Sequence, residues 1–428
     1  MPGAWLEIQR QRERRWRSFP DLVVHPSREW VPHFGGRRGV RAPLESLRGA
    51  RPGVAGPGRP PGAPHVIKVA LIRIEFKTDR GGSKSTGDGR FDLSNPGDSA
   101  PRIDRPPHNR KFYQDHLEAL RRYYDVQSYG TVDIQGEVWP RDTSRTGVQA
   151  YQVGDMADYG PWAFGSSIYP AAVTMFHEFL LAADAQAKAL RDTIPWYRYD
   201  GLLIVHAGSD LQSDVLQDSP EDIPTFTLGV ADTDRLVFPD SIKRCTPDPS
   251  DTLAAYCPIR DCLFLPETIN QDGYYGTLNA VIAHEDGHLL FGFSDLYNFE
   301  TGLPVVGYWS LMDTGNLAGG VVPVYGGESI FAVGLLPPSI DPFQRFYAGD
   351  ALTFREVSYD GASTPMLDSE RHPDMRAVTL TADEFVLLEN RAIARSDVDT
   401  VTVVRDPVSQ VILGPRDPDR YEYDALLP

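Results

Sequence analysis

The stretch that most constrains the fold of this chain is residues 277–292, which read TLNAVIAHEDGHLLFG. It begins with a threonine able to cap a helix, continues with an apolar face and ends in a glycine, so we predict a helix. On a helix, His284 and His288 lie one turn apart on the same face, and their imidazole nitrogens can converge on one ion. Glu285 lies beside His284, near enough to reach a water bound to that ion.

The five residues HEDGH match the HExxH pattern of zinc hydrolases. Zinc lowers the pKa of its bound water toward about 7, and the glutamate takes the proton as the hydroxide attacks a carbonyl. Glu285 would later deliver that proton to a leaving amine. With 10 histidines in 428 residues, a chance match has odds of roughly one or two in a hundred. The alternative, two histidines on a buried helix face, predicts nothing about the residues downstream.

The residues downstream supply the other parts of such a site. A catalytic zinc needs a third protein ligand and one open position. Gly292 lets the chain leave the helix and turn back, which brings Asp295 within reach of the ion. Met312, in the polar loop GYWSLMDTG, looks like the methionine of a metzincin Met-turn, which forms a hydrophobic floor below the metal histidines. Asp286 faces away from both histidines on an ideal helix, so we expect it to be solvated or to contact a ligand side chain.

The chain resembles the immune inhibitor A family of secreted bacterial metallopeptidases, which are metzincin-like. The similarity extends over most of residues 65–428, and the zinc helix and the Met-turn are its most specific parts. In chain order, the stretches that carry it are VIKVALIRIEF, LRRYYDVQSYGTVDIQGEVW, YDGLLIVHAG, AHEDGHLLFGFSDLY, YWSLMDTG, SIDPFQRFYAGD and EFVLLENR. The resemblance implies zinc on His284 and His288, Glu285 as the catalytic base and Asp295 as the third ligand.

One departure from the family pattern concerns the third ligand. The family places a glycine three residues and the acid six residues after the second histidine, whereas Gly292 and Asp295 follow at four and seven. The extra residue, such as Phe291, must be absorbed as a bulge or as a further helical step. Glu300 and Glu328 are the next candidates for the third ligand.

The segments before the zinc helix alternate between strand and helix patterns, which indicates an α/β or α+β fold. The expected strands are residues 65–76, 131–139 and 199–208, and the expected helices are residues 108–130 and 168–190. Together with the resemblance, this predicts a metzincin-like catalytic domain whose two lobes enclose a cleft. We expect an upper lobe over residues 63–292 and a lower lobe over residues 293–428, truncated at its C-terminus because the family continues beyond RYEYDALLP.

Residues 1–62 differ in composition from the rest of the chain. They contain twelve arginines, no lysine and five acidic residues, and they end in a proline- and glycine-rich run. Because such a sequence cannot build a packed core, we expect a flexible leader or pro-segment and linker. A tail that binds membrane or nucleic acid is the alternative. The N-terminus shows no apolar core typical of a secretory signal peptide, so secretion is an expectation from the family resemblance alone.

The overall composition constrains the partners. A hydrophobic content of 41% and a charged content of 24% are typical of a soluble globular protein. The formal net charge of −17 argues against nucleic acid or an anionic membrane as the main partner. No segment approaches the roughly 18 apolar residues needed to cross a bilayer. We therefore expect no nucleic-acid partner and no membrane insertion, whereas polypeptide substrates are an expectation from the HExxH motif and the family resemblance.

Two weaker sites stay open. Members of the family can bind Ca²⁺, and the loop VADTDRLVFPD offers Asp232, Asp234 and Asp240 as oxygen ligands, although an ordinary acidic surface loop is the simpler interpretation. Tyr297 and Tyr325 could supply a hydroxyl near the oxyanion of the reaction, although packing in the core or in a cleft wall is the simpler role.

Other residues have structural interpretations. His177 begins a second His-Glu pair, but Leu181 occupies the position of the second ligand, which predicts a histidine on a helix face. The three cysteines allow one local disulfide between Cys245 and either Cys257 or Cys262, or three unpaired thiols, and their spacing lacks the CxxC pair of a zinc site.

The sequence thus predicts a zinc-dependent endopeptidase, with two alternatives. One is a non-catalytic binding or adhesion module that keeps a structural zinc, and the other is a gluzincin-type peptidase with a distant glutamate as third ligand. Glu285 argues against the first, because a structural site needs no base. A structural site is also usually closed by four protein ligands, whereas only three are apparent in the sequence. The loop around Met312 argues against the second.

Overall fold

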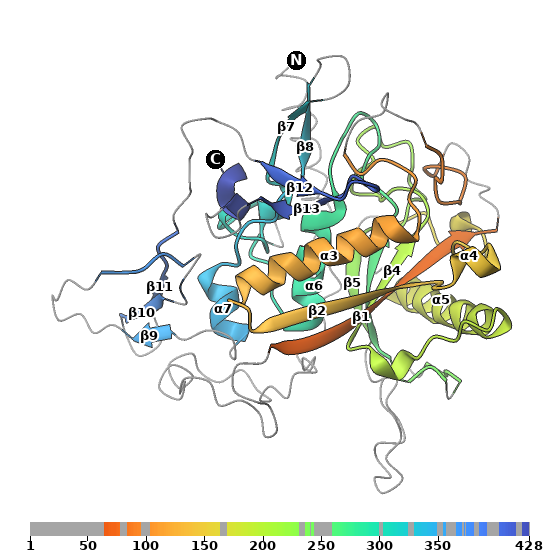
Figure 1. Cartoon of the computed structure of the whole chain (residues 1–428), viewed down its shortest axis with the longest axis horizontal. Coiled ribbons are helices and arrows are strands. Elements are labelled where there is room, and N and C mark those ends of the chain that lie inside the picture. The colour runs from red at the N-terminus through yellow and green to blue at the C-terminus, as the bar shows by residue number, and fades with distance from the viewer. Residues whose placement is uncertain are drawn as a thin grey trace, which may run out of the picture.

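The computed structural model describes most of the chain from residue 64 onward (Figure 1). The described residues are 64–77, 84–95, 103–162, 169–230, 236–239, 241–243, 259–298, 303–323, 329–348, 354–356, 365–369, 372, 374–380, 385–391, 402–416 and 422–427. The leader expected over residues 1–62 lies outside these ranges and stays a prediction.

A mixed sheet forms the centre of the structure (Figure 1). Its strands are β1 (His65–Phe76), β2 (Val132–Trp139), β3 (Tyr151–Val153), β4 (Gly201–His206), β5 (Phe226–Gly229) and β6 (Asp261–Pro266). The order is β2-β1-β4-β6-β5, with β3 pairing with β1. All pairs are parallel except β5, which runs antiparallel to β6 and forms one edge of the sheet. β4 and β6 are buried along their whole length, which explains why their sequences are mainly apolar and do not alternate.

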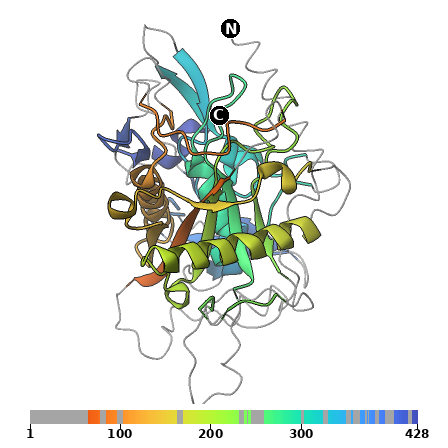
Figure 2. The same cartoon turned by 90° about the vertical axis from the view of Figure 1, so that its right-hand side faces the viewer.

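Helices cover both faces of this sheet (Figures 1 and 2). The α-helices are α3 (Arg110–Gln127), α4 (Thr143–Thr146), α5 (Tyr169–Ala189), α6 (Leu278–Phe291) and α7 (Pro342–Ala348). α3 and α6 pack together on one face, and Gly201 of β4 lets Leu290 of α6 approach closely, since a Cβ there would lie 2.7 Å from it. α5 crosses the opposite face, where the ring of Phe179 meets that of Phe76. The mixed α/β class and the helices and strands expected from the sequence are confirmed.

Smaller elements follow α6 in the chain. They are β7 (Gly319–Pro323), β8 (Ser329–Val333), β9 (Phe354–Glu356), β10 (Met375–Thr379), β11 (Phe385–Leu388), β12 (Val403–Arg405) and β13 (Ile412–Pro415). The final pair, β12 and β13, returns to α3 and α6. Asn279 of α6 donates to the carbonyl of Ile412 at 2.7 Å, and the ring of Tyr423 lies 5.3 Å from that of Tyr123 in α3. The last part of the chain therefore completes the surroundings of α6.

Two further expectations concern the cysteines and the membrane. Cys262 lies in β6 with a fully buried side chain, whereas Cys245 and Cys257 fall outside the described residues, so their pairing stays a prediction. Within the described part of the chain, no helix combines the length and the apolar content needed to cross a membrane.

Candidate metal centre

α6 carries the HEDGH residues and is buried from Leu278 to Leu290. Thr277 is the N-cap residue of α6, as the sequence suggested, but its hydroxyl donates to the carbonyl of Gly334 and does not cap the helix. Asp104 takes its place from far away in the sequence: the backbone N–H of Leu278 donates to its Oδ2 at 2.8 Å. A carboxylate at this end of a helix also interacts favourably with the helix dipole.

The structure brings the side chains of His284, His288 and Asp295 together. Nε2 of His284 lies 3.1 Å from Oδ1 of Asp295, and Nε2 of His288 lies 3.2 Å from the same oxygen. Each histidine donates from Nδ1 to a backbone carbonyl, His284 to Leu311 at 2.8 Å and His288 to Phe293 at 2.7 Å. In a neutral imidazole these bonds select the tautomer that has its hydrogen on Nδ1 and a free lone pair on Nε2. The Nε2 lone pairs of both histidines are therefore available to the same metal ion.

This donor set fits a zinc ion. Two imidazole nitrogens and one carboxylate oxygen are ligands that zinc takes at catalytic sites, where the fourth position is left for water. His284 and His288 are each 1% exposed and Asp295 is 5% exposed. The three ligand atoms lie within 4.8 Å of one another, close enough to share one ion. The other two candidates for the third ligand, Glu300 and Glu328, lie outside the described residues.

The extra residue before Asp295 is accommodated by a further helical step. α6 includes Phe291 and ends at Gly292, which adopts the left-handed conformation with a φ of 67°. Glycine adopts this conformation without strain, which allows the chain to reverse there. The ring of Phe291 stacks on Tyr124 of α3 at a centroid distance of 4.7 Å, so the added residue is held by packing. This is one of the two solutions expected from the sequence.

Met312 packs against α6 at Gly287, one residue before His288. Its side chain is fully buried, and a Cβ placed on Gly287 would lie 3.0 Å from its sulfur. The carbonyl of Met312 accepts a hydrogen bond from the backbone N–H of Leu296 at 2.7 Å, which connects this loop to the residue that follows Asp295. The role of Met312 as the hydrophobic floor of a Met-turn stays a prediction.

We expect Gly287→Ala to lower the free energy of unfolding by about 1–2 kcal/mol, measured by urea denaturation. Alanine favours a helix interior over glycine by roughly 0.5–1 kcal/mol, but overpacking a core costs roughly 1–3 kcal/mol. The new methyl group would lie 2.8 Å from Phe293 and 3.0 Å from Met312, both buried, so the packing cost should be the larger effect. A variant as stable as the parent chain, or more stable, would show that Met312 does not press on α6.

Glu285 lies beside the cluster and is bound by a residue that the sequence did not reveal. The hydroxyl of Thr227, in the edge strand β5, donates to Oε2 of Glu285 at 2.7 Å and lies 3.2 Å from the Glu285 carbonyl oxygen. This contact fixes the direction of the carboxylate relative to the histidines. β5 is only four residues long, and no local pattern identified Thr227 as a partner of the HEDGH helix.

His288 and Asp295 shift each other's pKa. Burial lowers the pKa of His288, but the neighbouring Asp295 carboxylate outweighs burial and raises that pKa to about 9. Burial alone would raise the pKa of Asp295, whereas the two histidines lower it well below its usual range. The hydroxyl of Tyr297 also donates to Oδ2 of Asp295 at 3.0 Å. Asp295 is therefore ionised, which is the form that a metal ligand needs.

Asp286 differs from its expected environment. The sequence suggested a carboxylate that is solvated or that contacts a ligand, but its side chain is fully buried and neither oxygen has a hydrogen-bond partner among the described residues. Burial and, after it, the charge of Glu285 raise the pKa of Asp286 well above its usual range. The reason is that α3 covers the side of α6 opposite the ligands, as shown by the Tyr124 hydroxyl, which donates to the carbonyl of Ala283 at 2.7 Å.

The weaker candidates lie apart from this centre or outside the described residues. The latter group contains Tyr325 and the three possible calcium ligands Asp232, Asp234 and Asp240, so the calcium proposal stays untested. Tyr297 contacts Asp295, and it thereby supports a ligand. His177 contacts the carbonyl of Val237 at 2.9 Å, in agreement with a histidine on a helix face.

A second acidic group comprises Asp214, Asp218 and Asp272, whose carboxylate oxygens also lie within 4.8 Å of one another. Two of these carboxylates already accept hydrogen bonds from backbone N–H groups. Asp214 accepts hydrogen bonds from the N–H groups of Asp218 and Ser219, and Asp272 accepts one from Leu216 at 3.0 Å. These contacts account for the group as part of the loop structure.

A scan against models of known protein families finds no match for this chain, and a search of curated proteins finds none either. The description of the centre therefore rests on its geometry. It consists of two histidines on one helix, a carboxylate from the segment that follows the helix, a methionine packed against the helix and a glutamate held by Thr227.

Proposed function

We propose that this protein is a zinc-dependent endopeptidase with a metzincin-like catalytic domain, similar to the immune inhibitor A family. The observation that carries the proposal is the convergence of the His284 and His288 Nε2 atoms on Oδ1 of Asp295, with Glu285 alongside. Zinc bound by these three side chains would supply a Lewis acid and a water of lowered pKa.

Glu285 is the general base and acid of the proposed reaction. Thr227 occupies its Oε2, which leaves Oε1 to exchange a proton with the attacking water. Glu285 accepts a proton from that water as the water attacks the peptide carbonyl, and then delivers the proton to the nitrogen of the leaving amine. The backbone carbonyls of Leu311 and Phe293 hold the histidine rings in place throughout.

The position of β5 favours a polypeptide substrate. Among the described residues β5 pairs only with β6, so it lies at an edge of the sheet, and its Thr227 contacts Glu285. An extended peptide can add to such an edge by backbone hydrogen bonds, which would lay the peptide across the centre. Recognition of the substrate through its backbone suits an endopeptidase, because such recognition does not require the N- or C-terminus of the substrate.

The two alternatives are less well supported. A structural zinc site is usually closed by four protein ligands, whereas three ligand side chains converge here in the described part of the chain. Glu285 would also have no role in such a site. A gluzincin-type site uses a distant glutamate as third ligand, and Asp295 occupies that position here.

The proposal is tested by metal analysis and casein cleavage on the full chain. We expect about one zinc per chain, cleavage that stops when a chelator removes the metal, and recovery when zinc is added back. His288→Ala should lose the zinc, whereas His177→Ala, which alters the other His-Glu pair, should keep both zinc and activity. Zinc retained by the His288 variant, or chelator-resistant cleavage by the parent chain, would overturn the proposal.

A further inference from the structure

Three consecutive residues after α6 contribute to the centre, and the middle one is held by a side chain from another element. Phe293 orients His288 through its carbonyl, and Asp295 supplies the third ligand atom. Between them, the backbone of Ser294 is bound on both sides by Gln344 of α7: its N–H donates to Gln344 Oε1 at 3.1 Å, and its carbonyl accepts from Gln344 Nε2.

Gln344 is suited to this contact. Its planar amide presents one acceptor and one donor, which match the N–H and the C=O of a single residue in the way a neighbouring strand would. The side chain is 1% exposed, so solvent does not compete for these bonds. A segment that leaves a helix at a glycine has no secondary structure of its own, and the Gln344 amide supplies the missing backbone partners of Ser294.

α7 is itself fixed in two directions. Arg345, the residue after Gln344, donates to the backbone carbonyl of Gln127 at 2.6 Å and to its side-chain oxygen at 2.7 Å, which attaches α7 to the end of α3. Asp341 accepts from the backbone N–H groups of Phe343 and Gln344 at 3.0 and 3.1 Å. The helix backbone that carries the Gln344 side chain is therefore held in place.

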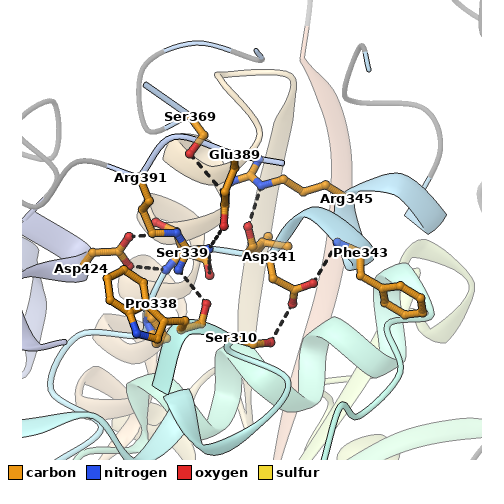
Figure 3. A network of polar contacts seen from close by, with 12 residues as sticks. Ser310, Pro338, Ser339, Asp341, Phe343, Arg345, Ser369, Glu389, Arg391 and Asp424 are labelled. Atoms are coloured by element: carbon orange, nitrogen blue, oxygen red, sulfur yellow. Dashed lines mark hydrogen bonds and ion pairs between the residues drawn. The ribbon is translucent and has the colours of Figure 1, made fainter. Parts of the chain in front are cut away.

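Asp341 also connects α7 to the Met-turn (Figure 3). Its Oδ2 accepts a hydrogen bond from the Ser310 hydroxyl at 2.6 Å, and the Ser310 oxygen accepts one from the N–H of Met312 at 3.1 Å. Leu311, between these two residues, provides the carbonyl that orients His284. The beginning of α7 thus supports both backbone carbonyls that bind the metal histidines.

We propose that Gln344 is a positioning residue for the metal centre: its amide fixes the segment that carries Asp295 and the carbonyl that orients His288. This inference rests on the proposed zinc function. It also explains how a chain with one residue more than the family spacing keeps its third ligand in reach, because the lengthened segment is bound at Ser294.

The test compares two buried glutamines that make the same kind of contact. Gln212 also binds both backbone groups of one residue, accepting from Thr225 N–H at 2.9 Å and donating to the Thr225 carbonyl at 2.7 Å. It touches none of the three ligands or their carbonyl partners. Gln344→Met and Gln212→Met remove the same two hydrogen bonds with little change in side-chain volume, so both should lower thermal stability.

Only Gln344→Met should alter the metal centre. We expect its zinc affinity, measured by competition with a chelating dye, to fall about 10–100-fold, and the visible absorption bands of the Co²⁺-substituted protein to shift. Gln212→Met should keep the parent affinity and spectrum. If Gln344→Met does not fold, Gln344→Asn, which keeps the amide but is one methylene too short to reach Ser294, should show the same changes.

The outcomes separate this inference from the proposed function. A parent chain that binds no zinc would overturn both. A parent chain that binds zinc, together with a Gln344 variant whose zinc affinity and Co²⁺ spectrum equal those of the Gln212 variant, would overturn the positioning role alone and leave Gln344 a structural residue.

Discussion

The Glu285→Ala chain is expected to bind zinc as tightly as the parent chain and to cleave casein ~10²–10⁴-fold more slowly. Glu285 is not one of the three converging ligands, so its removal leaves the metal in place. What is lost is the carboxylate that Thr227 holds beside the centre, and with it the proton transfer to and from the reacting groups. Zinc content and the rate of casein cleavage, measured on the same preparation, test this prediction.

The control for this variant is Glu178→Ala. Glu178 is the acid of the second His-Glu pair in the chain, and it lies exposed on α5, where it accepts a hydrogen bond from Tyr159 at 3.1 Å. Its loss should leave cleavage unchanged. Normal cleavage by the Glu285 variant would mean that another group acts as the base. Loss of zinc from it would mean that Glu285 is itself a ligand.

The Asp295→Ala chain is expected to bind zinc more than ~100-fold more weakly than the parent chain and to lose activity at low zinc. Loss of a residue that only supports a ligand typically costs 10–100-fold in metal affinity, so loss of the ligand itself should cost more. The effect on zinc affinity should be large because Oδ1 of Asp295 lies close to both Nε2 atoms. Its removal takes away the one negatively charged ligand and leaves two neutral imidazoles to bind the ion. Competition with a chelating dye measures the affinity.

A matched control is Asp218→Ala, which removes an exposed carboxylate from the second acidic group. That change should not affect zinc binding. An Asp295 variant with the parent affinity would place the third ligand elsewhere, and Glu300 and Glu328 would be examined next. This experiment decides whether the lengthened segment after α6 really supplies the ligand.

The helical part of the site could be predicted because it depends on local spacing. His284 and His288 are four positions apart, so any helix places them on one face, and Gly292 marks the end of that helix through its backbone freedom. The same holds for the long buried strands and for α3 and α5, whose apolar patterns extend over many residues. The extra residue could be recognised as well, but the choice between a bulge and a helical step depended on the packing of Phe291 against Tyr124.

The contacts that complete the site could not be predicted, because they join positions far apart in the chain. Asp104 reaches Leu278 across 174 residues, Thr227 reaches Glu285 across 58 and Gln344 reaches Ser294 across 50. No local period encodes such pairs. The environment of Asp286 was misjudged for the same reason, since a helical pattern assigns it to the face away from the ligands but does not show that α3 covers that face.

During synthesis on the ribosome, α6 is made long before the segment that covers its first turn. Asn279 needs the carbonyl of Ile412, and Tyr123 of α3 needs the ring of Tyr423, so these contacts form only after residues 402–427 have been made. A core that is closed by a late segment assembles after most of the chain has been translated. In the proposed peptidase, the surroundings of α6, the helix that carries His284 and His288, would therefore be completed only near the end of synthesis.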